Sequence, residues 1–130
     1  MIGIDTSAII DLFKGRKEVK EALLRAGGPY ASTQVNYAEL MFGLNPEHPK
    51  SKLEEEYYDE FFSSISLLRL TEIAAKRAAK IHWELKAAGK MVEPFDCLTA
   101  GILIENGVTS IMTKNIKHFE RMKDLKVIGY

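Results

Sequence analysis

The chain has 130 residues, 46% of them hydrophobic and 28% charged, which is typical of a folded globular protein and excludes a disordered one. Its 18 basic and 18 acidic side chains cancel, so a nucleic-acid ligand would need a local basic patch. The single cysteine, Cys97, excludes an internal disulfide, and no leader or membrane-spanning stretch is visible, so we expect a cytoplasmic protein with one domain over residues 1–130.

Short apolar segments alternate with amphipathic ones along the whole chain. Their periodicity and the positions of Gly and Pro predict, in chain order, strand 1–4, helix 8–13, helix 16–26, strand 30–32, helix 34–44, helix 50–64, strand 65–70, helix 71–88, helix 95–105, strand 108–112, a short helix 119–122 and strand 126–128. Strands that alternate with helices favour a parallel sheet covered on both faces. We therefore expect an α/β fold built as one three-layer α/β/α sandwich.

Several single residues support or extend this assignment. Thr6 and Ser7 can cap the first helix, and Thr33 can cap the third. Cys97 lies in an apolar helical run and is expected to be a small core residue. The stripe formed by Leu53, Tyr57 and Phe61 is expected to belong to the core or to a dimer interface.

Asp5 follows the first predicted strand directly and precedes a helix. Ligands of open parallel sheets bind beyond the carboxyl ends of the strands, which places Asp5 at the binding edge. The alternative is that Asp5 only caps the helix, and this residue alone does not decide between the two interpretations.

Glu39 and Asp96 are acids within otherwise apolar helical segments. Glu39 shares a helical face with Asn36, three residues earlier, which also fits the solvent side of an amphipathic helix. Asp96 begins a helix with no other charge between 95 and 104, where an acid is stabilised by the helix dipole and could equally serve as a metal ligand.

The loop after the predicted strand 108–112 should reach the same sheet edge. There Thr113 and Asn115 offer neutral oxygen atoms, although Asn is also a common turn residue. Carboxylates that converge without Lys or Arg between them repel one another, and a hard divalent cation relieves that repulsion. Such an ion can activate water against a phosphodiester, so the pattern favours metal-dependent hydrolysis.

Four short motifs in order resemble the PIN-domain family of VapC-type toxin ribonucleases. They are Ile4-Asp5-Thr6-Ser7, then Ala38-Glu39-Leu40 with Gly43-Leu44, then Pro94-Phe95-Asp96 with Leu98 and Ala100, and finally Thr113-Lys114-Asn115 leading to His118-Phe119-Glu120 and Leu125-Lys126-Val127. The resemblance spans residues 2–127. It implies a Rossmann-like sandwich and a Mg²⁺- or Mn²⁺-dependent endoribonuclease, often a homodimer neutralised by a cognate antitoxin.

Matched residue by residue, the resemblance assigns Asp5, Glu39 and Asp96 to the acidic metal positions, and Thr6 or Ser7 to the hydroxyl position after the first acid. Many members of the family carry Asp where this chain has Asn115, so we expect one ion to bind well and a second only with RNA present. Thr113 and Asn115 would hold the outer shell or the substrate. The RNA backbone would meet a basic rim drawn from Lys14, Arg16, Lys114, Lys117 and Arg121, each of which could also be an ordinary surface cation.

Other functions remain open at this stage. A haloacid-dehalogenase-like phosphatase also begins with a strand ending in Asp, but it needs a second Asp two residues later, where this chain has Ser7. A response-regulator receiver needs a phosphoacceptor Asp after a middle strand, which we cannot place. A non-catalytic metal- or partner-binding module would use the acids structurally. His118 is expected to be a surface residue, and no histidine has a partner at metal-ligand spacing.

Overall fold

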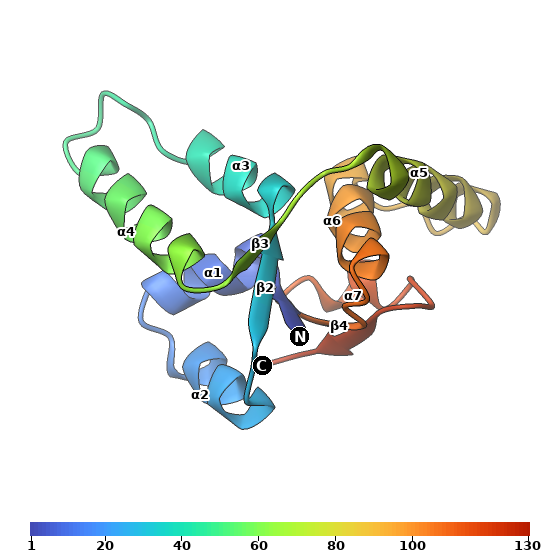
Figure 1. The fold of residues 1–130 in the computed structure, drawn as a ribbon, viewed down its shortest axis with the longest axis horizontal. Helices are drawn as coiled ribbons and strands as arrows, with labels where there is room; N and C mark the ends of the chain where they lie inside the picture. Colours follow the sequence, from blue (N-terminus) through green and yellow to red (C-terminus); the bar gives the residue numbers. More distant parts are fainter.

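A five-stranded parallel sheet forms the centre of the computed structural model, which describes all 130 residues (Figure 1). The strands are β1 (Ile2–Ile4), β2 (Tyr30–Thr33), β3 (Ser66–Leu68), β4 (Ser110–Met112) and β5 (Lys126–Ile128), in the spatial order β3-β2-β1-β4-β5. Central β1 pairs with β2 through Gly3 and Ala31 and with β4 through Gly3 and Ile111. Since the order changes direction between β1 and β4, the carboxyl ends of these two strands mark the expected ligand site.

Seven helices cover the two faces of the sheet. They are α1 (Thr6–Phe13), α2 (Lys17–Ala26), α3 (Gln34–Phe42), α4 (Ser51–Ser63), α5 (Glu72–Ala87), α6 (Pro94–Glu105) and α7 (Ile116–Phe119). Figure 1 shows α1, α2 and α4 on one side of β2 and α5, α6 and α7 on the other. The predicted α/β class with a parallel sheet is therefore confirmed.

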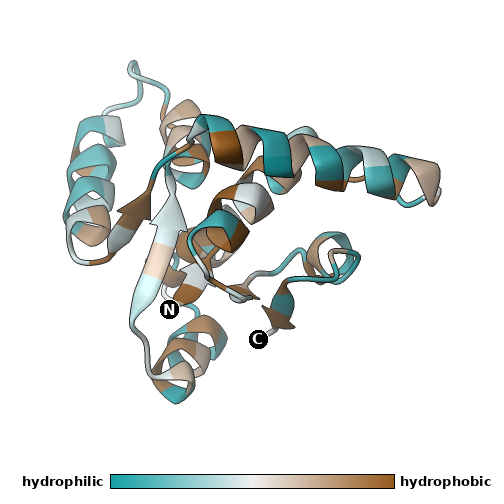
Figure 2. Cartoon of the chain, turned by 45° about the vertical axis from the view of Figure 1, so that its right-hand side comes forward, coloured by the Kyte–Doolittle hydropathy of each residue, from teal (hydrophilic) through white to brown (hydrophobic).

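The hydrophobic core has two main clusters, and a third small one, formed by Val35, Ala74 and Ile102, joins α3 to α5 and α6. One cluster joins the sheet to α5, α6 and α7 and contains Leu103, Ile111 and Phe119, and a second joins it to α1, α2 and α3 around Ile4 and Ile9. In Figure 2 the long helix α5 alternates between hydrophilic and hydrophobic residues, as expected for a helix that packs on one side only. No helix combines the length and the apolar character needed to cross a membrane.

Two details of the predicted elements are wrong. The last short helix was expected at 119–122 but occupies Ile116–Phe119, because Asn115 takes the N-cap position directly after the β4 loop. Thr6 is the first residue of α1 rather than its cap, and the cap position belongs to Asp5. By contrast, Thr33 caps α3 as expected, with its hydroxyl accepting from the backbone N–H of Asn36.

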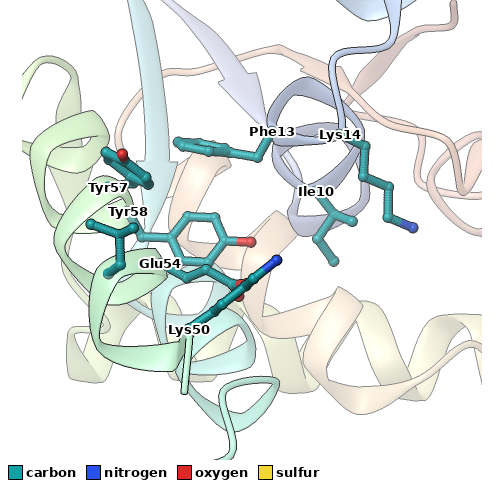
Figure 3. Close-up of a pocket in the computed structure, with 8 residues that line it drawn as sticks. Ile10, Phe13, Lys14, Lys50, Glu54, Tyr57 and Tyr58 are labelled. Atoms are coloured by element: carbon teal, nitrogen blue, oxygen red, sulfur yellow. The ribbon is translucent and has the colours of Figure 1, made fainter. Parts of the chain in front are cut away.

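The stripe on α4 is more exposed than a core position would be. Leu53 and Tyr57 are about half exposed, at 50% and 51%. They line a groove between α1 and α4, where Ile10 and Phe13 face Tyr57 and Tyr58 (Figure 3). Leu53 and Tyr57 are therefore not core residues, which leaves the dimer-interface alternative for them, whereas Cys97 is buried as expected.

Candidate active site

Asp5 lies where β1 ends and is almost completely buried, at 2% exposure. Its Oδ2 atom accepts hydrogen bonds from the hydroxyls of Thr113, at 2.8 Å, and Ser7, at 3.0 Å, and its Oδ1 atom accepts from the Asn36 amide at 3.2 Å. Asp5 stands at the N-cap position of α1, but its side-chain hydrogen bonds go to Ser7, Thr113 and Asn36, so helix capping alone does not account for its contacts. Burial raises the pKa of Asp5, and the bonds from Thr113 and Ser7 oppose that rise.

Glu39 reaches the same edge from the second turn of α3. Its Oε1 atom accepts a hydrogen bond of 2.7 Å from the hydroxyl of Thr6, at the start of α1. The pKa of Glu39 is raised, first by burial and further by the negative charges of Asp5 and Asp96, while the bond from Thr6 lowers it. Glu39 therefore belongs to the group of acids and is not an isolated solvent-facing residue.

Asp96 stands in the first turn of α6 and is 7% exposed. Its Oδ2 atom lies 2.7 Å from Nδ1 of His118, a residue of α7 whose side chain is 40% exposed. The expectation that His118 is only a surface residue is therefore wrong. Burial raises the pKa of Asp96, the contact with His118 lowers it, and the charge of Asp5 raises it again.

The charge of Asp5 thus raises the pKa of both Glu39 and Asp96, and the charge of Asp96 raises that of Glu39, yet the three acids do not form a closed ligand set. No three Asp, Glu, His or Cys side chains converge closely enough to hold an ion as they stand. The reason is visible in their partners, because each carboxylate is turned to a neutral donor or to His118, and like charges repel. No Lys or Arg side chain bonds to any of the three.

The sequence also matches the model of a family described as PIN domain, over residues 2–125. The chain belongs to the PIN domain family. A relative from Shigella flexneri, the tRNA(fMet)-specific endonuclease VapC, is 30% identical over 127 residues, which cover 95% of this chain and 92% of that protein. Ribonuclease VapC1 from Methanocaldococcus jannaschii is 29% identical over 121 residues, or 93% of this chain and 80% of the relative.

Solved structures agree with this assignment at the level of the fold. The DNA-bound VapBC complex from Salmonella typhimurium contains a chain that superimposes with a TM-score of 0.83 at 20% identity, covering 98% of this chain and 96% of that one. Membership of the PIN domain family removes the phosphatase and receiver alternatives.

The neutral residues expected around the acids of this PIN domain divide into two groups. Thr6, Ser7 and Thr113 are bonded to an acid, and Thr113 is completely buried. The side chain of Asn115 bonds to none of the acids, and its backbone N–H donates to the Thr113 hydroxyl at 2.9 Å. It lines an open hollow together with Lys114, Lys117 and His118. Asn115 is therefore free to meet a ligand from solvent.

The basic residues are spread around this edge in different ways. Lys117 and Lys114 line the hollow beside Asn115, while Lys14 lines the groove between α1 and α4. Arg16 is bonded to Asp11 at 3.3 Å. The guanidinium of Arg121 donates to the backbone carbonyls of residues 90 and 91, so the structure does not gather the five cations into one patch.

Two polar residues of the PIN domain were missed or underrated by sequence reasoning. Asp11 is only 4% exposed and accepts from the hydroxyl of Tyr130 at 2.7 Å, with Arg16 and Lys114 nearby. Its position among apolar residues of α1 is a signal that could have found it. Asn36 is completely buried and bonded to Asp5, a contact that no sequence pattern indicates.

Proposed function

We propose that this protein is a metal-dependent endoribonuclease and the toxin component of a type II toxin–antitoxin pair. The observation that carries the proposal is the group formed by Asp5, Glu39 and Asp96, three acids with raised pKa at one sheet edge and no Lys or Arg bonded to them. The two relatives named as an endonuclease and a ribonuclease, matched over more than nine-tenths of this chain, supply the substrate class.

The chemistry of the donor atoms fits Mg²⁺ or Mn²⁺, and the three carboxylates would have to draw closer together than they stand to share one ion. All three acids offer hard carboxylate oxygens, and the neighbouring Thr113 and Asn115 offer neutral ones, which suits these cations better than softer metals. Asp5, Asp96 and Glu39 would hold the ion, and a bound ion would supply Lewis-acid stabilisation of the scissile phosphate and a water of lowered pKa.

The protein's own residues prepare this site in three ways. Thr113 and Ser7 hold the Oδ2 atom of Asp5, and Thr6 holds the Oε1 atom of Glu39, so both carboxylates have defined orientations before any ligand arrives. Glu39 is the least buried of the three and is suited to orient the attacking water. Lys114 and Lys117, on the rim of the open hollow, would contact the RNA backbone.

Substitution of the acids tests the catalytic proposal. Total RNA and an initiator tRNA transcript are incubated with the protein in Mg²⁺ or Mn²⁺, with and without a chelator. We expect Asp5→Asn and Asp96→Asn to reduce cleavage to the level of RNA alone while circular dichroism shows an intact fold. Asp124→Asn is the matched control, because Asp124 is exposed and makes no ion pair, and its activity should equal that of the wild type. Full activity in both active-site variants refutes the proposal.

The number of ions is a separate question that concerns Asn115. A neutral amide in place of a fourth acid leaves one negative charge fewer, so we propose that one ion binds the free protein and a second needs the RNA phosphate. Calorimetric titration with Mn²⁺ in the absence of RNA should show one site. Two tight sites in the free protein contradict this stoichiometry, and no Mn²⁺ binding at all favours a non-catalytic module.

The partners follow from the same family. The Salmonella structure is a VapBC complex, and we propose that this chain likewise pairs with a cognate antitoxin, forms a homodimer and acts on RNA in the cytoplasm. Expression of the chain alone should arrest growth, and co-expression of a small protein encoded beside it should restore growth and co-purify. A monomer by light scattering, or growth unaffected by active protein, overturns the corresponding part of this assignment.

A further inference from the structure

Asn36 occupies the centre of a polar network that joins the ends of β1 and β2 to α1 and α3. Its side chain is 0% exposed. One N–H of its amide donates to Oδ1 of Asp5 at 3.2 Å, and the other donates to Oγ1 of Thr6 at 3.0 Å. Its Oδ1 atom accepts from the backbone N–H of Thr33 at 3.2 Å and from the Thr33 hydroxyl at 2.8 Å. Every donor of this buried amide is used.

These partners allow the amide only one orientation. The backbone N–H of Thr33 can only donate, so it must face the oxygen of Asn36, and the ionised carboxylate of Asp5 can only accept, so it must face the nitrogen. A flipped amide would set donor against donor on one side and acceptor against acceptor on the other. Asn36 therefore presents both N–H groups to the acids in a fixed direction.

Thr6 extends the effect of Asn36 to the second acid. Because the Thr6 oxygen receives a hydrogen bond from Asn36, its own hydroxyl proton is directed to Glu39, whose Oε1 lies 2.7 Å away. Asn36 thus acts on Asp5 directly and on Glu39 through one hydroxyl. Asn36 and Glu39 also share α3, so the same helix carries an acid and the residue that orients it.

A simpler explanation is that Asn36 only caps a helix. Asn36 and Thr33 do form a reciprocal capping box at the start of α3. That motif accounts for the bonds with Thr33, and it leaves unexplained the two N–H groups that point away from the helix end to Asp5 and Thr6. A residue needed only for the cap would not have to contact a buried acid 31 positions earlier in the chain.

We propose that Asn36 is a positioning residue that sets the geometry of Asp5 and Glu39 for binding the catalytic metal ion. The proposal rests on the proposed metal-dependent function and adds a residue outside the acids and hydroxyls assigned above. In metal sites, partners that orient the ligands typically contribute 10–100-fold to metal affinity. Asn36 should therefore act on metal binding, beyond its contribution to the stability of α3.

Calorimetric titration of the full chain with MnCl₂ tests this directly. We expect Asn36→Ala to weaken Mn²⁺ binding about tenfold or more. Thr6→Val keeps the shape of a side chain that is only partly buried, and it should weaken binding by breaking the link to Glu39. If Asn36 acts through Thr6, the double variant should lose clearly less affinity than the two single losses combined. Asn106→Ala is the matched control, because the exposed Asn106 amide only donates to the Ile102 carbonyl in α6.

The outcomes separate this inference from the proposal on which it rests. If the wild type binds Mn²⁺ and Asn36→Ala binds it equally well while unfolding more easily, Asn36 is only a helix cap and the inference is refuted. Should Asn36→Ala fail to fold, unchanged affinity in Thr6→Val refutes it, and a loss in Thr6→Val with none in Asn106→Ala supports it. A wild type that binds no Mn²⁺ overturns the metal site itself and this inference with it.

Discussion

Gly101 sits at the closest approach between α5 and α6, where a side chain has no room. A Cβ atom added there would stand 2.7 Å from the carbonyl oxygen of Ala74 and 2.9 Å from both the Cβ and the backbone N of Ala78. Contacts below 3.0 Å force the neighbour to move, and here the neighbour is the backbone of a helix and not a flexible side-chain end. Gly101→Ala must therefore push α5 and α6 apart by several tenths of an ångström.

Two opposite effects decide the size of the loss in Gly101→Ala. Overpacking of a close-packed core costs about 1–3 kcal/mol. Replacing Gly by Ala within a helix favours the folded state by about 1 kcal/mol. Because the clash is with rigid backbone, the cost should lie in the upper part of its range, and we expect the free energy of unfolding to fall by about 1–2 kcal/mol. Since α6 carries Asp96, nuclease activity should fall as well.

Urea denaturation followed by far-UV circular dichroism measures the effect. Gly43→Ala is the matched control, because Gly43 is exposed, has an ordinary φ of −78°, and would place its Cβ no closer than 3.3 Å to a neighbour, the Leu40 carbonyl oxygen, so this substitution should cost less stability than Gly101→Ala. A Gly101→Ala protein as stable as the wild type, or more stable, would refute the packing argument.

The remaining predictions concern two buried acids. The pKa of Asp5 is raised in the folded protein. At a pH below the ordinary pKa of 3.8, the Asp5 carboxyl is therefore protonated in both the folded and the unfolded chain. As the pH rises from there toward the folded-state pKa, the unfolded chain ionises first, and the free energy of unfolding falls. The free energy of unfolding of Asp5→Asn, relative to that of the wild type, should therefore grow with pH by at most about 1.4 kcal/mol per pH unit. Urea titrations from acid to neutral pH measure this difference. A difference in unfolding free energy that stays constant over that range contradicts the prediction. Tyr130→Phe removes the hydroxyl that donates to Asp11 at 2.7 Å and should cost about 1.5–3 kcal/mol, the value of a hydrogen bond to a charged group. Asp11 retains Arg16, so a Tyr130→Phe protein with unchanged stability would show that the ion pair alone satisfies this acid.

Much of the fold could be predicted from local patterns. Alternation of apolar strands with amphipathic helices predicted the parallel sheet, and the cap at Thr33 is visible as a Thr before a helical run. The expectation that Asp5 lies at the ligand edge needed only the rule that parallel strands end on one side of the sheet. The boundary of α7 was missed because its helical pattern is only four residues long.

The contacts that organise the candidate site could not be obtained in this way. The order β3-β2-β1-β4-β5 decides which strand ends are neighbours, and periodicity along the chain does not contain that order. Asp5 meets Thr113 across 108 positions, and Asp96 meets His118 across 22. Contacts between residues so far apart in the sequence depend on how the helices pack on the sheet, and that packing is a property of the whole core.

By itself, then, the sequence determined which residues could be ligands, because residue type, strand ends and helix faces are local properties. Only the tertiary structure decided how those ligands are held: Asn36 and Thr6 between Asp5 and Glu39, His118 on Asp96, and Gly101 where α6 meets α5. The physical reason is that hydrogen bonds and close packing act over a few ångströms in space, whatever the separation of their partners along the chain.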